Sequence, residues 1–253
     1  MKAKLKTLSY FAALILLLTP NTSYAEVTGW YFTRSGHDLP PCPPEFSWLE
    51  EHGGYYVDRK ATPEDKRIYL TFDAGYENGN IAKILDVLAE KDAHGTFFIL
   101  ENMVKREADL VMRMKNEGHT IANHSATHPD MTRLSEAEFS GELERMDSCY
   151  KKLTGESIAR FYRPPEGKLS EESIGFAERM GYKTVMWSFA YADWDNDAQP
   201  DPASSVEKIL SNTHNGMIIL LHPTSATNAA ILGQLIDSWR AEGYRFATVD
   251  ELV

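Results

Sequence analysis

Residues 67–73 read RIYLTFD, an apolar strand pattern that ends in an aspartate, and this stretch decides the fold. Further apolar runs follow it along the chain, with a helical pattern between each run and the next. Strands that alternate with helices form βα units, and the strands of such units lie parallel. We therefore predict an α/β fold of about seven units. The later strands are expected at residues 95–100, 119–123, 160–163, 183–188, 216–221 and 245–248.

Helical patterns fill the intervals between these strands. Ser135 and Glu138 form the pair of a capping box at the start of one of them. Gly118, Gly181 and Gly243 each follow a helical pattern, where a C-terminal glycine is common. Periodicity alone leaves a small βα barrel and an open doubly wound sheet as alternatives. The helices are expected at residues 79–92, 103–117, 135–153, 170–180, 202–212 and 225–242.

Residues 1–25 have the pattern of an export signal. They contain an N-terminal cluster of lysines, an apolar run at residues 8–18 and a small-residue cleavage pattern at residues 23–25. The apolar run is short for a bilayer span, but an uncleaved membrane anchor is the alternative. No later stretch is apolar enough to span a membrane. We therefore predict an extracytoplasmic protein with no stable membrane span after signal removal.

Two parts are expected after the signal, an irregular extension at residues 26–65 and a catalytic domain at residues 66–253. Loss of the three signal lysines lowers the net charge from −11 to −14. Such an acidic chain argues against nucleic acid as a partner. Binding to an anionic wall polymer must then depend on short-range contacts in a cleft. The chain has two cysteines, Cys42 and Cys149, and a disulfide between them and two free thiols are equal alternatives.

Unusual polar residues occur where the predicted strands end. The carboxyl ends of parallel strands lie on one face, which carries the active site in barrels and in open α/β sheets. Each residue alone has an ordinary alternative role, such as a turn cap, a surface ion pair or a core histidine. Their shared position favours an active site. The residues are Asp73, His124, His128, Arg163, Asp193 and His222.

These segments resemble the five motifs of the polysaccharide deacetylase family, also called the NodB-homology or carbohydrate esterase 4 family. The resemblance covers about residue 66 to the end, and the motifs occur in the family's order. It implies a distorted βα barrel and an enzyme that hydrolyses an N-acetyl group. The motifs are TFDAG at 71–75, HSATH at 124–128, RPPEG at 163–167, DW at 193–194 and LLH at 220–222.

Three further segments are similar to one subgroup, the delta-lactam-biosynthetic de-N-acetylases of the spore cortex. They are IYLTFDAGYENGN at 68–80, WSFAYADW at 187–194 and GGYYVD at 53–58. The resemblance implies N-acetylmuramic acid in peptide-stripped peptidoglycan as substrate, muramic-δ-lactam as eventual product, and a secreted, cell-wall or forespore intermembrane location. The alternatives are an N-acetylglucosamine deacetylase of peptidoglycan or chitin and an inactive glycan-binding module of the cell wall.

The resemblance also implies roles for the residues at the strand ends. Asp73 would be the general base, with Arg163 orienting it and lowering its pKa. His222 would be the general acid that protonates the leaving amine, and Asp193 would raise its pKa and keep it charged. Such opposite effects on a base and an acid give both groups the required form near neutral pH.

Three more residues of the motifs are expected to contact the substrate. The resemblance implies that the backbone N–H of Glu166 helps to bind the oxyanion that forms during amide hydrolysis. It also implies that Trp194 and Leu220 line the pocket for the acetyl group. Ordinary core packing is the alternative for both of these apolar side chains.

The family's divalent metal, often zinc, is usually held by one aspartate and two histidines. His124 and His128 match the histidines, but Ala74 stands where the aspartate is expected. Catalytic zinc normally has three protein ligands and a water, so one ligand is missing. We therefore expect a weakly bound divalent metal, with water or an oxygen of Asn123 or Glu77 as substitute ligand. Loss of activity is the alternative.

Overall fold

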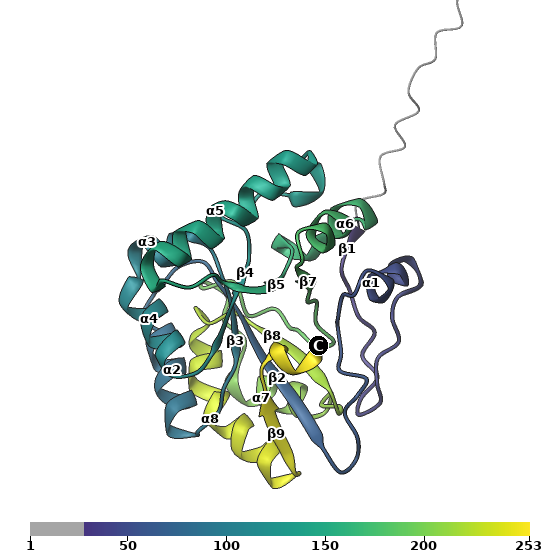
Figure 1. Cartoon of the computed structure of the whole chain (residues 1–253). Helices are drawn as coiled ribbons and strands as arrows, with labels where there is room; N and C mark the ends of the chain where they lie inside the picture. Colours follow the sequence, from purple (N-terminus) through teal and green to yellow (C-terminus); the bar gives the residue numbers. More distant parts are fainter. Residues whose placement is uncertain (1–27) are drawn as a thin grey trace, which may run out of the picture.

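The computed structural model describes residues 28–253, so the predicted signal peptide lies outside the described residues. Figure 1 shows a curled sheet with helices around its outer side. The strand order is β7-β5-β4-β3-β2-β8, with β9 also paired to β2, and the strand pairs within this sheet are parallel. This arrangement confirms the predicted α/β barrel fold. The strands are β2 (Lys66–Ala74), β3 (Thr96–Ile99), β4 (Thr120–Asn123), β5 (Ala159–Tyr162), β7 (Lys183–Thr184), β8 (Met217–Leu221) and β9 (Tyr244–Ala247).

Strand β2 pairs with β3, β8 and β9, and both of its faces are apolar. Leu70 and Phe72 point to the core that the helices cover, whereas Tyr69 points to the strand-lined interior. Burial of one such large apolar side chain contributes about 1.5–3 kcal/mol. Asp73 lies at the carboxyl end of the strand, which β3 and β8 flank.

The helices follow the predicted order, with one difference. The helix expected at residues 103–117 is two helices, because Glu107 between them has φ −123° and ψ 40°. The two pieces pack on different neighbours, α3 on α5 and α4 on β4 and α2, which accounts for the change of direction. The capping box of Ser135 and Glu138 is present. The helices are α2 (Ile81–Glu90), α3 (Glu101–Arg106), α4 (Ala108–Asn116), α5 (Glu136–Thr154), α6 (Glu171–Arg179), α7 (Pro202–Leu210) and α8 (Ala226–Ala241).

The strand expected at residues 183–188 is regular only over β7. Beyond it, the carbonyls of Val185 and Met186 accept hydrogen bonds from the Arg163 side chain, at 2.9 and 3.3 Å, instead of from a neighbouring strand. Phe189 then forms a parallel bridge with Ile219 of β8. The two edges of the curled sheet are therefore joined by irregular backbone rather than by a full strand.

The extension before β2 packs along this irregular edge, and Figure 1 shows it in purple beside β7 and α6. It contains β1 (Thr28–Gly29), the short 3-10 helix η1 (Pro44–Phe46) and α1 (Trp48–Glu51). Strand β1 pairs antiparallel with β6 (Lys168–Leu169), and Tyr55 forms a bridge with Val185. The division at residue 65 stays a prediction. Cys42 and Cys149 are both free, so they do not form a disulfide.

Over residues 28–253, no helix combines the length and the apolar character that a membrane span requires. The remaining short elements are 3-10 helices, two of which lie in the loops after β4 and β5 and one of which follows β9. They are η2 (Met131–Arg133), η3 (Pro165–Gly167) and η4 (Val249–Leu252).

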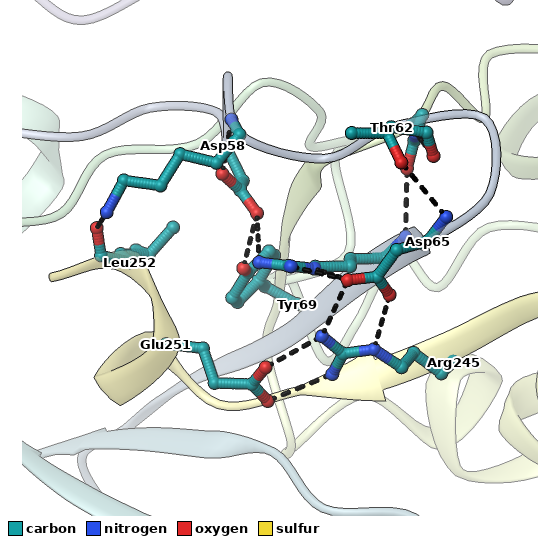
Figure 2. Close-up of polar contacts among 10 residues, drawn as sticks. Asp58, Thr62, Asp65, Tyr69, Arg245, Glu251 and Leu252 are labelled. Atoms are coloured by element: carbon teal, nitrogen blue, oxygen red, sulfur yellow. Dashed lines mark hydrogen bonds and ion pairs between the residues drawn. The ribbon is translucent and has the colours of Figure 1, made fainter.

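A polar network at the amino end of β2 ties the extension to the C-terminal residues (Figure 2). Asp58 of the extension is buried and accepts hydrogen bonds from Tyr69 Oη at 2.7 Å and Arg67 Nη1 at 3.2 Å. Asp65 pairs with Arg245 at 2.7 Å, and Arg245 also pairs with Glu251 at 2.8 Å. The network lies at the opposite end of β2 from Asp73, so its contribution is to stability.

We expect Asp58→Ala to destabilise the whole fold, because it leaves the Tyr69 hydroxyl and the Arg67 guanidinium without their buried partner. The expected loss is about 2–3 kcal/mol, or about 5–10 °C in Tm for a chain of this size. Thermal unfolding followed by circular dichroism measures it. Asp65→Ala is the control, and a smaller decrease is expected because this carboxylate is more exposed. Equal effects of the two changes would contradict the assignment.

Candidate active site

A cavity of about 690 Å³ lies at the carboxyl ends of the strands. This volume is in the range of small-molecule sites, about 300–1,000 Å³. Seven of the predicted site residues line it, and the other two, Arg163 and Asp193, are buried behind them. The predicted residues on its wall are Asp73, His124, His128, Glu166, Trp194, Leu220 and His222.

Asp73 is held against a fully buried cation. Arg163 Nη1 donates to Asp73 Oδ1 at 2.9 Å, and the guanidinium also lies 4.1 Å from the centre of the Phe98 ring. Burial alone raises the pKa of the Asp73 carboxyl. The charge and hydrogen bond of Arg163, with a further contribution from His222, outweigh it and lower the net pKa below its usual value. The carboxylate is therefore ionised at neutral pH.

His222, which also lines the cavity, is paired with a buried carboxylate. Asp193 Oδ1 lies 2.7 Å from His222 Nδ1, and Asp193 Oδ2 accepts from the backbone N–H of His222 at 2.8 Å. Burial lowers the pKa of the imidazole, but the hydrogen bond and charge of Asp193, together with the charge of Asp73, outweigh it and raise the net pKa. The protonated form of His222 therefore persists to higher pH than that of a free histidine.

Asn228 is a residue of this site that sequence reasoning missed. Its side-chain amide donates to Asp193 Oδ2 at 2.6 Å and to the carbonyl of His222 at 3.0 Å. Its Oδ1 accepts from the Tyr191 hydroxyl. Asn228 lies in the first turn of α8, where polar residues are common at the start of a helix, so its presence there does not indicate a functional role. The available signal was a polar side chain on the buried face of that helix.

His124 and His128 lie side by side, with ring centres 5.0 Å apart. A loop rather than a helical turn brings them together, because Ser125 and His128 have φ values of 73° and 61°. Ser125 Oγ accepts from the N–H of His128 at 3.0 Å and fixes this turn. The two rings are thus neighbours because of left-handed backbone, which non-glycine residues seldom adopt.

The protonation state of His124 fits a metal ligand. Its Nδ1 lies 2.8 Å from the carbonyl of Arg163, and a carbonyl only accepts, so Nδ1 carries the proton. The other nitrogen, Nε2, is then free to bind a metal, and it lies 3.7 Å from Asp73 Oδ2. Burial lowers the pKa of His124 to about 4, so the ring is neutral at pH 7.

A third protein ligand is missing. Ala74 is fully buried, and its methyl group supplies no ligand atom. Asn123 Oδ1 accepts from the N–H of Ser125 at 2.9 Å, and Glu77 accepts from the N–H of Ile81 at 3.1 Å, so both substitute oxygens have other partners. Within residues 28–253, no group of three His, Cys, Asp or Glu side chains is arranged for a metal ion. The residues fit a two-histidine site and not a three-ligand site.

The RPPEG loop places Glu166 on the cavity wall in an unusual conformation. Glu166 has φ 55°, and Gly167 after it has φ 65°. A side chain at Gly167 would lie 2.7 Å from the Trp187 ring, so only glycine fits there. The Glu166 carboxylate pairs with Lys168 at 2.6 Å.

Two apolar side chains complete the wall near His222. The Trp194 side chain is 59% exposed, and its ring centre lies 6.0 Å from that of His222 in an edge-to-face arrangement. Leu220 is buried, with 5% of its surface exposed, and also lines the cavity. An aromatic ring this exposed contributes little to core packing, so core packing does not account for the position of Trp194.

Comparison with known proteins defines the class. A model of the polysaccharide deacetylase family matches residues 60–185. The peptidoglycan-N-acetylmuramic acid deacetylase PdaA of Bacillus subtilis is 37% identical over 230 residues, which cover 90% of this chain and 86% of that protein. The chain therefore belongs to the polysaccharide deacetylase family, the family 4 carbohydrate esterases, which are hydrolases acting on N-acetyl groups.

Solved structures agree with this membership. The structure of B. subtilis PdaA, a family 4 carbohydrate esterase, has a TM-score of 0.84 and covers 90% of this chain and 97% of that chain. A peptidoglycan-N-acetylglucosamine deacetylase of Bacillus cereus is 29% identical over 212 residues, 82% of this chain and 74% of that protein. BA3943 of Bacillus anthracis, a pseudoenzyme of the family, is 27% identical with a TM-score of 0.69, over 76% of this chain and 66% of that chain.

Proposed function

We propose that the protein removes the N-acetyl group from N-acetylmuramic acid residues of peptide-stripped peptidoglycan. One observation carries the proposal. Asp73 and His222 line the same cavity, and each is held by a buried partner of opposite charge. The 37% identity to a peptidoglycan-N-acetylmuramic acid deacetylase supports the choice of sugar. The freed amine would then close onto the lactyl carboxyl to give muramic-δ-lactam.

In the proposed reaction, Asp73 takes a proton from water while the water oxygen bonds to the acetamide carbonyl carbon. Arg163 keeps Asp73 ionised and oriented. The carbonyl oxygen becomes an oxyanion, to which the backbone N–H of Glu166 donates. His222 gives its proton to the nitrogen as the C–N bond breaks, so acetate and a free amine leave. Asp193 stabilises the imidazolium before this transfer.

The acetyl group itself needs an apolar surface. Trp194 and Leu220 both line the cavity beside His222, so we propose that they enclose the acetyl methyl group. In this position they would also exclude bulk water from the reacting carbonyl, which strengthens the electrostatic interactions inside the site.

Family 4 carbohydrate esterases are generally metal-dependent. We propose that His124 and His128 bind a divalent metal, with zinc as the first candidate. Binding is weak because Ala74 supplies no oxygen. A bound cation would supply additional positive charge for the oxyanion.

We expect Ala74→Asp to increase the affinity for zinc, because it adds the carboxylate that the family uses beside two histidines. The expected change is at least about tenfold in Kd, since even a group that only orients a metal ligand is typically worth about 10–100-fold in metal affinity. Titration calorimetry with zinc alone measures it without reference to activity. Ala74→Ser, which adds a weaker oxygen ligand, is the comparison. Unchanged affinity in Ala74→Asp would contradict the two-histidine site.

The substrate is tested with intact and peptide-stripped peptidoglycan, by measuring acetate and identifying the deacetylated sugar by mass. Release from muramic acid residues of stripped glycan supports the proposal. Deacetylation of N-acetylglucosamine alone would replace it with the activity of the B. cereus relative. Binding without acetate release, even with added zinc, would favour an inactive glycan-binding module, for which Ala74 is the motivating feature.

The proposed location is extracytoplasmic, either secreted or in the cell wall, including the intermembrane space of a forespore. The supporting facts are the peptidoglycan relatives and the export pattern of residues 1–25. The proposed partner is the glycan strand alone, with no nucleic acid.

A further inference from the structure

Two exposed aromatic rings lie on the wall of the same cavity. Trp194 is 59% exposed and Tyr76 is 46% exposed, and both line the cavity. Over residues 28–253, the other large apolar side chains that are exposed are Tyr31, Leu39 and Val253. Exposed apolar groups beside a cavity commonly mark a binding groove. Trp194 already has a proposed role at the acetyl group, whereas Tyr76 has none.

Tyr76 is held in its exposed position by polar contacts. Asn196 Nδ2 donates to the Tyr76 hydroxyl at 2.6 Å, and Asn78 Nδ2 donates to Asn196 Oδ1 at 3.4 Å and to the carbonyl of Thr224 at 2.8 Å. Three loops are joined in this way, those after β2, before α7 and after β8. Trp194 and His222 lie on two of these loops, and Asp73 lies in β2 just before the third, so the position of Tyr76 is coupled to the reacting groups.

The loop that carries Tyr76 makes further contacts that hold its backbone in place. Asn102 donates to the carbonyl of Gly75 at 3.2 Å, and a side chain at Gly75 would meet Leu100 at 3.0 Å. Glu77 accepts from the N–H groups of Gly79 and Ile81 at the start of α2. A ring that is fixed before binding loses little conformational entropy when a ligand packs on it.

We propose that Tyr76 binds the sugar next to the reacting residue in the glycan strand, so that the enzyme selects a chain over a single sugar. This proposal rests on the proposed function and specifies how its substrate is held. A pyranose ring presents C–H groups on its flat face, which pack on an aromatic ring, and its hydroxyls reach polar side chains such as Asn196. An acidic protein that cannot attract an anionic strand at long range needs short-range contacts of this kind.

The test uses the full mature chain and a peptide-free tetrasaccharide of alternating N-acetylglucosamine and N-acetylmuramic acid. Tyr76→Ala is expected to raise KM for the tetrasaccharide about tenfold while kcat changes less than about twofold, the size of one aromatic contact. Tyr76→Phe keeps the ring and is expected to retain most of the affinity. Tyr31→Ala is the matched control, since Tyr31 is also 46% exposed but does not line the cavity.

The outcomes separate this proposal from the proposed function. If Tyr76→Ala keeps the wild-type KM, or if Tyr31→Ala changes KM equally, Tyr76 does not bind the neighbouring sugar. If the wild type releases no acetate from any glycan, the proposed reaction fails. Titration calorimetry with the same tetrasaccharide, on wild type and Tyr76→Ala, then still decides the binding proposal. An unchanged Kd in the variant would overturn it.

Discussion

Replacement of Asp73 by asparagine is expected to lower kcat for acetate release by about 10²- to 10⁴-fold, the usual contribution of a general base. Asparagine keeps the size of the side chain and one oxygen for Arg163, but it cannot take a proton from water. Acetate release from peptide-stripped glycan, with and without added zinc, measures the effect. Activity within about tenfold of wild type would exclude Asp73 as the base.

Folding and catalysis must be separated in this experiment, because Arg163 is fully buried and pairs with Asp73. A neutral partner leaves that guanidinium less well compensated, which destabilises a fold by itself. Thermal unfolding and calorimetric binding of stripped glycan show whether the variant is folded and binds. Asp237→Asn is the control, because it makes the same change at an exposed ion pair with Lys91.

Replacement of His222 by glutamine is expected to lower kcat by a similar factor, about 10²- to 10⁴-fold, because the leaving amine loses its proton donor. The pH profile of the wild type is an independent test of His222 as the general acid. The pKa of His222 is raised, so the imidazolium is present below that pKa and is lost as pH rises through it. Activity of the wild type should therefore decrease on the alkaline side at a pH above the usual pKa of histidine.

Replacing Asp193, the partner of His222, tests directly whether the alkaline decrease reflects the pKa of His222. Asp193→Asn removes the negative charge that raises the pKa of His222, so the alkaline decrease should move to lower pH. The pH dependence of kcat measures it. Asp195→Asn is the matched control, since this exposed carboxylate accepts from the backbone of Asp197 and has no contact with His222. An alkaline decrease that stays in place in Asp193→Asn would contradict general acid catalysis by His222.

The fold was largely predictable because each βα unit carries its own local pattern. Strand β2 shows this best, since its apolar residues fill both faces and its end is marked by Asp73. The exceptions depend on residues far apart in the chain. The predicted strand at residues 183–188 ends early because the side chain of Arg163 takes two of its carbonyls. Periodicity contains no information about such a contact.

The candidate site was predictable to the extent that its residues occur at strand ends. Asn228 was not, because it follows His222 by one loop and lies in a helix start. The left-handed backbone at Ser125 and His128 was also not predictable, since neither residue is glycine and no local sequence feature requires that conformation. These features arise only when separate loops pack together.

The extension has a consequence for the order in which the chain acquires its structure. Residues 28–57 leave the ribosome early, yet their partners are Lys168–Leu169, Val185 and Met217, which are made much later. Contacts between such distant residues form slowly. Residues 28–57 can therefore pack only after these later partners have been made, so this segment is among the last of the described residues to become ordered.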